Sequence, residues 1–295
     1  MATENPPVVF TPASQQRSLV ESFREVFAYR GYVGYLVKRD LRTNYLQTYL
    51  GWIWSLAQPL LTLAIYSIVF GYILQVNRGT ASPTGLDNFP AFLFAALIVW
   101  GFFRQSANGT MNAFAGSMTL RKKLYFPPVV PSLARTLTNS VELIPEVMML
   151  MVFYITLWAI GGPRTVGITW LAIIPIIIMV GLFGMGVGLF MAVPNVRYGD
   201  VSMLFNVFIR LYFYLTPIIW PLSVAQKRFG NRPMLLNIVT WSPATQFVEA
   251  SRDVLYRLQM PSLNSWVYLF VISTTMFFGG WTRFHRRAGK AAEGQ

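Results

Sequence analysis

Long stretches without a charged residue constrain this chain more than any other feature of its sequence. No Asp, Glu, Lys or Arg occurs in the 35 residues between Arg42 and Arg78, nor in the 32 residues from Thr165 to Val196. About 20 apolar residues in a helix are enough to cross the hydrocarbon layer of a bilayer. A helix also satisfies its own backbone N–H and C=O groups where water is absent. The sequence therefore predicts a membrane protein built from helices.

Composition agrees with this interpretation. Hydrophobic residues make up 54% of the chain and charged residues 12%, whereas soluble domains carry about 25% charged residues. This excludes a disordered chain and an ordinary water-soluble enzyme. The chain has no cysteine and one histidine, His285, so we expect no disulfide, no thiolate metal site and no histidine-based metal site or catalytic triad.

We expect an all-α integral membrane protein with six transmembrane helices. A buried helix in a soluble core is the alternative for any one span, but length and lack of charge favour lipid. The spans belong to a single transmembrane domain at residues 17–287, between a flexible tail at 1–16 and a C-terminal tail at 288–295. The predicted spans cover about residues 52–74, 89–111, 138–160, 167–193, 201–220 and 265–281.

The distribution of Lys and Arg predicts the orientation. With the N-terminus inside, 15 basic residues lie on the cytoplasmic side and seven outside, while Arg104 and Arg210 fall within spans. Basic residues favour the cytoplasmic side, so we expect both termini on the cytoplasmic side of the membrane. Residues 1–16 lack the basic start and short apolar run of a signal peptide.

Two further helical features lie outside the spans. Residues 18–30 place Leu19, Val20, Phe23, Val26 and Phe27 on one helical face, which predicts an amphipathic helix on the inner membrane surface or against a soluble partner. Between spans five and six, residues 235–241 and 244–258 are separated by Ser242-Pro243. Neither can cross a bilayer, so they predict a re-entrant helical hairpin, with a solvated surface hairpin as the alternative.

Arg104 and Arg210 are candidates for a substrate pathway. A cation at the midplane of a lipid-facing helix costs roughly 2.5–3.5 kcal/mol, so such residues normally face a polar interior. An anionic group such as a phosphate would suit either one; a structural pair or interhelical hydrogen bond is the alternative. Neighbouring aromatic residues could stack on sugars, although packing is their commoner role: Trp100, Phe102, Phe103, Phe208, Tyr212, Phe213 and Tyr214.

The loop after the second predicted span joins a basic cluster to an apolar one. Arg121, Lys122 and Lys123 precede Leu124, Tyr125 and Phe126, and Pro127-Pro128 then ends any helix. An exposed aromatic cluster of this kind favours docking of a soluble partner, although a basic triplet alone mostly sets topology.

No energy source is visible in the chain. The phosphate-binding pattern GxxxxGK[ST] does not occur, and its nearest match, Gly162–Thr169, lacks the lysine. Glu142 and Glu146 could form a proton relay, but a water-exposed helix end near Arg121 is the favoured interpretation. We therefore expect a conduit that is not itself an enzyme and is driven by another subunit. In the fourth span, Gly181, Gly184 and Gly188 predict close helix packing, within one subunit or across a dimer.

Several motifs together resemble ABC transporter permeases that export polysaccharides. The similarity extends over roughly residues 17–287. The motifs are RDLRTNYLQTYLGWIWSLAQP (39–59), RKKLYFP (121–127), PNVRYGD (194–200), LTPIIWP (215–221), and WSP (241–243) followed by EASR (249–252).

The resemblance implies a homodimer of six-span subunits bound to two copies of a cytoplasmic ATPase, which would hold ATP and Mg. The permease itself would hold no cofactor and bind no nucleic acid. Residues 121–127 would couple to the ATPase beside the 18–30 helix. The re-entrant hairpin, with Trp241, Glu249 and Arg252, would gate the outer mouth. The implied substrates are glycans on polyprenyl diphosphate or a comparable lipid, such as O-antigens, teichoic acids, capsules and mycobacterial galactan.

Two other functions remain open at this point. A permease of the same fold could export a small hydrophobic compound or drug, and a membrane scaffold could have no transport path. An ATPase with a sugar-binding extension encoded beside glycosyltransferases would favour glycan export. A drug-resistance phenotype without a glycan defect would favour the second function, and failure to co-purify with an ATPase would favour the third.

Overall fold

The computed structural model describes residues 19–46, 53–75, 88–121, 126–159, 161 and 166–293. Over these residues the chain is built from helices and turns, with no strand. The all-helical class is therefore confirmed. The predicted tail at residues 1–16 lies outside the described residues.

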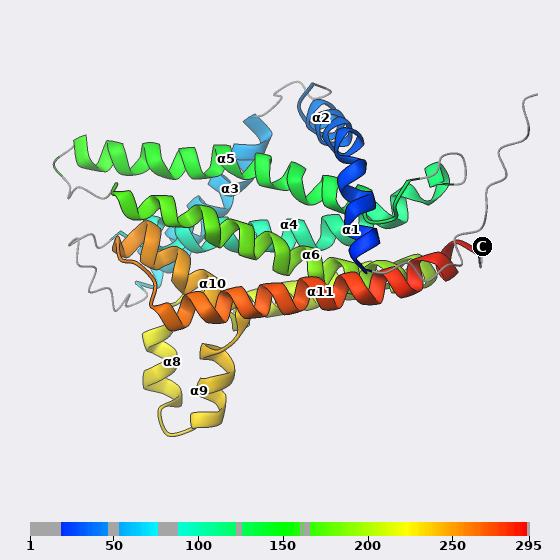
Figure 1. The fold of residues 1–295 in the computed structure, drawn as a ribbon. Helices are drawn as coiled ribbons and strands as arrows, with labels where there is room; N and C mark the ends of the chain where they lie inside the picture. The colour runs from blue at the N-terminus through cyan, green and yellow to red at the C-terminus, as the bar shows by residue number, and fades with distance from the viewer. Residues whose placement is uncertain are drawn as a thin grey trace, which may run out of the picture.

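Three helical segments are long and apolar enough to cross a membrane: Phe89–Leu120, Val130–Ala159 and Ile168–Arg197. They correspond to helices α4 (Phe89–Arg121), α5 (Val130–Ala159) and α6 (Ile173–Arg197, preceded by the 3₁₀ turn η2, Ile168–Ala172), and they coincide with predicted spans two, three and four (Figure 1).

The other three predicted spans fall on helices that length and composition alone do not establish as spans. The first is α3 (Ile53–Tyr66) with the π-helical turn η1 (Ser67–Ile73), and the fifth is α7 (Val201–Leu215); both contain short apolar helices. The sixth falls within α11 (Leu263–Glu293). The count of six spans remains a prediction.

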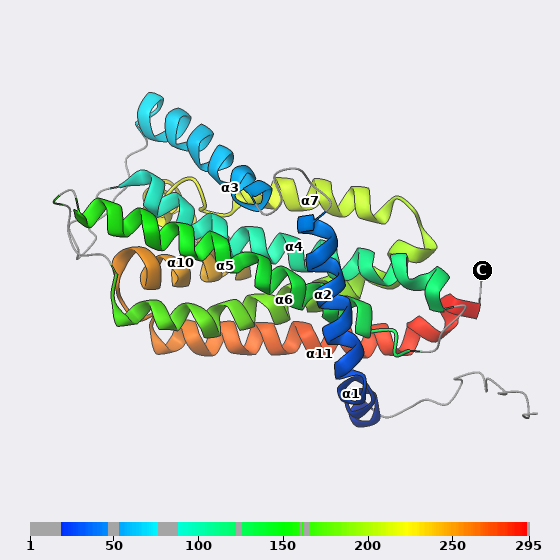
Figure 2. The ribbon, with the colours of Figure 1, turned by 90° about the horizontal axis from the view of Figure 1, so that it is seen from above.

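Helix α6 lies between α4 and α11 and packs closely against both (Figures 1 and 2). Glycine makes this close packing possible. A Cβ added at Gly188 would lie 2.5 Å from the carbonyl oxygen of Ala107 in α4, and one at Gly186 would lie 2.5 Å from that of Met276 in α11. Any larger side chain would force the helices apart. The glycines of the fourth predicted span therefore pack helices within one subunit, as expected.

The N-terminal helices α1 (Leu19–Ala28) and α2 (Arg30–Leu46) lie across the bundle (Figure 2). The amphipathic helix predicted at residues 18–30 is α1. Its Phe23 ring stacks on Trp281 of α11, with centroids 4.2 Å apart, while Phe27 is 68% exposed. Part of the apolar face thus anchors α1 to the subunit, and Phe27 remains available to lipid or a partner.

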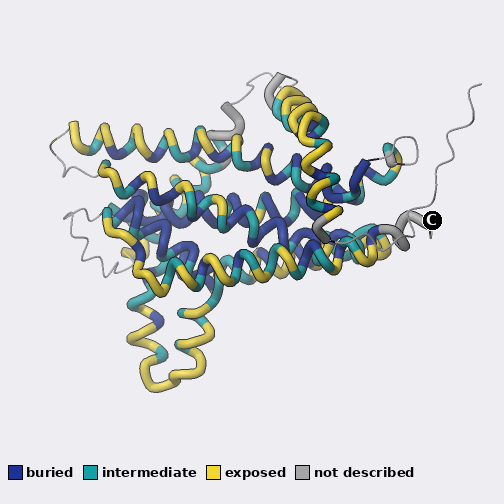
Figure 3. Tube along the Cα trace, in the orientation of Figure 1, coloured by how far each residue is buried: buried dark blue, intermediate teal, exposed yellow. Residues whose placement is uncertain are grey.

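Between α7 and α11 the chain forms α8 (Leu222–Phe229), α9 (Pro233–Thr240) and α10 (Pro243–Arg252), which continues as the π-helical turn η3 (Asp253–Arg257). The helix break at Ser242-Pro243 is confirmed. Helix α10 packs on α4 in the bundle, whereas α8 and α9 project from it and are largely exposed (Figures 1 and 3). Helix α10 buries Phe247 and Val248 against the bundle, whereas α9 has no buried residue although its sequence is the more apolar. The re-entrant placement in a membrane remains a prediction.

Candidate functional site

A cavity of about 880 Å³ opens between α3, α4, α5 and α7, and it is the candidate functional site. Four charged side chains line it, Arg104, Arg210, Glu142 and Glu146. Arg104, Glu142 and Glu146 lie within the long apolar helices α4 and α5. Charged residues in such helices usually face a polar interior. The cavity therefore brings charged side chains together among apolar helices.

The two predicted pathway arginines meet in this cavity. Arg104 comes from the middle of α4 and Arg210 from α7. Both side chains are exposed, and neither forms an ion pair within the part of the chain that the structure describes. An arginine without a partner retains all five N–H donors for a ligand or for another subunit.

The glutamates of α5 also line this cavity, contrary to expectation. We expected Glu142 and Glu146 at a water-exposed helix end near Arg121. Glu146 is instead only 9% exposed and faces the same cavity as Arg104. Glu142 accepts a 2.7 Å hydrogen bond from Nδ2 of Asn44, which lies near the end of α2. The four-residue spacing of the glutamates on an apolar helix was the available sequence signal, because it places both on one face.

The predicted aromatic residues divide between the cavity and the core. Trp100, Phe213 and Tyr214 line the cavity, and the rings of Trp100 and Phe213 pack edge to face with centroids 5.7 Å apart. Phe102 is 2% exposed and packs against Gly181, where an added Cβ would lie 3.3 Å from its ring. Phe103 is 6% exposed in the same core.

Tyr212 takes a third position, between the cavity wall and the start of α10. Its ring packs edge to face against Trp100, with centroids 5.6 Å apart. Its hydroxyl forms a 2.6 Å hydrogen bond with Ser242. Tyr212 thus connects the cavity-lining helix α7 to the residue that precedes α10.

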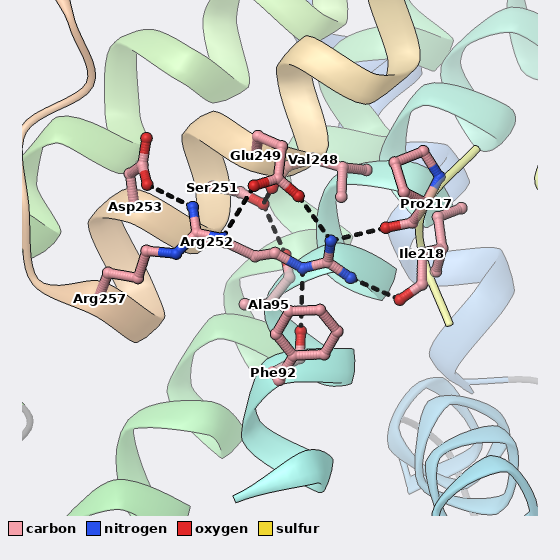
Figure 4. Close-up of polar contacts among 10 residues, drawn as sticks. All are labelled: Phe92, Ala95, Pro217, Ile218, Val248, Glu249, Ser251, Arg252, Asp253 and Arg257. Atoms are coloured by element: carbon pink, nitrogen blue, oxygen red, sulfur yellow. Dashed lines mark hydrogen bonds and ion pairs between the residues drawn. The ribbon is translucent and has the colours of Figure 1, made fainter. Parts of the chain in front are cut away.

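A second polar centre lies around Arg252 (Figure 4). This side chain is fully buried, with 0% exposed. Nη1 donates to the main-chain oxygen of Pro217 at 2.6 Å and Nη2 to that of Ile218 at 2.5 Å. The guanidinium also lies 3.6 Å from the centroid of the Phe92 ring. A buried charge is tolerated when it is paired and hydrogen-bonded in this way.

Glu249 balances the charge at this centre. Its carboxylate accepts hydrogen bonds from Arg252 at 2.8 Å and from Arg257 at 2.9 Å, and Arg257 also pairs with Asp253 at 2.7 Å. Burial would raise the pKa of the Glu249 carboxyl, but the two arginines outweigh it and hold that pKa below its ordinary value. The pairs Glu249–Arg252 and Asp253–Arg257 join residues three and four apart, as neighbours on one helical face do.

Trp241, the third residue of the predicted outer gate, lies apart from this cluster. It follows α9, is 54% exposed, and its main-chain oxygen accepts a hydrogen bond from the hydroxyl of Tyr268 in α11. The structure thus pairs Glu249 with Arg252, whereas Trp241 lies directly after α9, one of the two helices that project from the bundle.

The predicted coupling segment is described only at its ends. Lys122, Lys123, Leu124 and Tyr125 lie outside the described residues, and α4 ends at Arg121. Phe126 is 3% exposed, and its ring lies 5.6 Å from that of Tyr32 in α2; Pro127 is buried as well. The expectation that Phe126 is exposed is wrong, because α2 covers it.

Comparison with known proteins defines the class. Residues 32–256 match the ABC-2 type transporter family, so the chain belongs to this family of membrane transport proteins. The O-antigen export system permease protein RfbA of Myxococcus xanthus is 24% identical over 277 residues, which cover 93% of this chain and 99% of the relative.

Two further relatives are similar over most of their length. An RfbA protein of Klebsiella pneumoniae is 26% identical over 221 residues, covering 74% of this chain and 78% of the relative. The polysialic acid transport protein KpsM of Escherichia coli is 23% identical over 253 residues, covering 83% and 89%.

Proposed function

We propose that this chain is the membrane subunit of an ATP-driven exporter that moves a lipid-linked polysaccharide out of the cytoplasm. The names of the relatives support polysaccharide as the cargo. The observation that carries the proposal is the cavity in which Arg104 and Arg210 lie beside Trp100 and Phe213 and form no ion pair with any described residue. Guanidinium groups bind phosphate and aromatic rings stack on sugars, so the cavity suits a glycan on a polyprenyl diphosphate.

The exposure of the two arginines supports a homodimer. In a lone subunit, the open side of the cavity that Arg104 and Arg210 line would face hydrocarbon, where a charge costs roughly 2.5–3.5 kcal/mol. A second copy placed against α3 and α7 would close the cavity into a polar path and remove that cost. On α7, the side chains of Leu204, Val207 and Leu211 are more than half exposed and would supply the apolar contact.

Energy would come from a separate cytoplasmic ATPase in two copies, which binds ATP and Mg. The end of the bundle where α4, α6 and α11 finish is the proposed docking side (Figure 2). Basic residues at these helix ends, including Arg197 and Arg286, support a cytoplasmic position for it. The protein would thus lie in the bacterial inner membrane with both termini inside.

Depletion of the chain in its own cells tests this function. We expect a lipid-linked glycan to accumulate on the cytoplasmic side while glycan at the cell surface falls. Restoration of the wild-type chain should reverse both effects, and restoration of the Arg210→Ala variant should not. Normal surface glycan together with new sensitivity to hydrophobic compounds would replace this proposal with drug export.

A further inference from the structure

A second cavity, of about 570 Å³, lies between α2, α4 and α5 and adjoins the first at Gln105, which lines both. Its polar wall contains Arg39, Arg135, Asn108 and Asn112. Its apolar wall is formed mainly by Tyr32, Leu36, Leu120 and Phe126. The cavity is therefore amphipathic, because charged and amide side chains, including the carboxylate of Asp40, line it together with apolar ones.

Arg135 supplies the net charge of this cavity. Its aliphatic part crosses α4 at Gly109, where an added Cβ would lie 2.9 Å from Cγ of Arg135. It has no ion-pair partner among the residues described. Arg39, by contrast, is paired with Asp40 at 2.8 Å. Two arginines and one aspartate leave one uncompensated positive charge, and it belongs to Arg135.

Buried amide groups beside Arg135 have unmet hydrogen-bonding capacity. Asn139 is 1% exposed, and neither its Oδ1 nor its Nδ2 has a hydrogen-bond partner among the described residues; the same holds for Oδ1 of Asn108. The Asn139 amide lies next to the Arg135 stem, 3.1 Å from the position of a Cβ at Gly109. A buried polar group without a partner costs about 1–3 kcal/mol. Asn108 lines the cavity, whereas Asn139 lies behind Arg135 and does not line it.

We propose that this cavity binds the phosphate group of a lipid. The Arg135 guanidinium and the side-chain amides of Gln105, Asn108 and Asn112 donate to the phosphate oxygens, and the lipid chain lies along Leu36 and Phe126. Basic pockets between membrane helices bind phosphate headgroups in this way. The source is either a bilayer phospholipid or the diphosphate of a polyprenyl carrier. Only the second source rests on the proposed function.

Native mass spectrometry of the full-length complex, purified from membranes and stripped of lipid, tests this site. Four lipids serve as probes: phosphatidylglycerol, diacylglycerol, a polyprenyl diphosphate and the polyprenol of the same length. The matched control is Arg42→Gln, since Arg42 is an exposed arginine of α2 that does not line the cavity.

We expect the phosphate-bearing lipids to bind about tenfold more weakly to Arg135→Gln than to the wild type, and within about twofold of wild type to Arg42→Gln. Arg135→Lys should restore part of the affinity, because the charge returns without the planar fork. If Arg135→Gln does not remain folded, Asn108→Ala carries the same expectation. Equal binding of phosphate and neutral lipids, or unchanged binding to the cavity variants, would overturn the inference.

The two phosphate lipids distinguish the sources. Tighter binding of the polyprenyl diphosphate assigns the site to the export substrate, and equal or tighter binding of phosphatidylglycerol assigns it to the bilayer. Glycan accumulation on depletion tests the export function independently. Phosphatidylglycerol binding without glycan accumulation would therefore preserve the site and reject the export function. Glycan accumulation with no preference for either phosphate lipid would support the export function and reject the site.

Discussion

Arg252 donates a 2.6 Å hydrogen bond to the main-chain oxygen of Pro217, 35 residues earlier in the chain. Pro217 lies in the non-helical turn that follows α7, and Arg252 lies at the end of α10. The same guanidinium donates to Phe92 near the start of α4. One side chain thus satisfies carbonyls at the ends of two helices that line the candidate pathway, so the position of α7 and its Arg210 depends on α10.

Arg252→Met should destabilise the protein by about 3–5 kcal/mol, because it removes one of the two arginines that pair with Glu249 and leaves the Pro217 and Ile218 carbonyls without their donor. Thermal unfolding of the purified protein in detergent measures this. Arg257→Met is the matched control, since Arg257 is 30% exposed and pairs at the edge of the cluster. A loss for Arg252→Met no greater than that for Arg257→Met would show that the buried contacts do not hold α7 and α10 together.

Arg210→Ala should lower glycan export roughly tenfold or more, since a charged hydrogen bond contributes about 1.5–3 kcal/mol. Folding and association with the ATPase should remain, because no described contact depends on the Arg210 side chain. Surface glycan in complemented cells measures export, and Arg228→Ala, at an exposed arginine of α8, is the control. Wild-type export by Arg210→Ala would remove this residue from the pathway.

Gly188→Ala should destabilise the bundle by about 1–3 kcal/mol, as overpacked cores do. The added methyl would lie 2.5 Å from the Ala107 carbonyl oxygen, so α4 and α6 must separate. Gly34→Ala provides the opposite case, because no atom lies within 4 Å of its added Cβ and alanine favours the helix by up to about 1 kcal/mol. Unfolding temperatures that move in the same direction for both variants would contradict this packing.

Phe126→Ala should weaken the contact between α2 and the start of α5 and destabilise the protein by about 3–5 kcal/mol. Stimulation of the ATPase should fall with it, because the described end of the coupling segment, at Phe126 and Pro127, loses its support against α2. Limited proteolysis within α2 and the ATPase rate of the complex measure the two effects. Tyr35→Ala, at a side chain 61% exposed on α2, should change neither. Intact α2 with a normal ATPase rate in Phe126→Ala would show that the segment holds its position without this ring.

Several elements could be predicted from the sequence because their signals are local. Uncharged runs and helical periodicity depend only on neighbouring residues, and they located α4, α5 and α6. Ser242-Pro243 likewise predicted the break before α10, because proline cannot continue a helix that precedes it. The pairing of Glu249 with Arg252 followed from their three-residue spacing.

Other features could not be predicted because they depend on residues far apart in the chain. Phe126 looked exposed beside the basic cluster, yet α2 covers it. The sequence favoured a water-exposed helix end for Glu146, yet this residue is buried and lines the same cavity as Arg104 of α4 and Arg210 of α7. In each case the neighbour that decides the environment lies 20 or more residues away, and no local periodicity reports it.

The sequence by itself determined that this chain is helical and suited to a membrane, since long uncharged segments have few other stable environments. It also determined that two arginines must find a polar setting. Only the tertiary structure decided which helices provide that setting, that Arg252 is enclosed while Arg210 is not, and that Arg135 faces a separate cavity. The physical reason is that the solvation of a charge depends on what the packed helices place around it, and packing is a property of the whole chain.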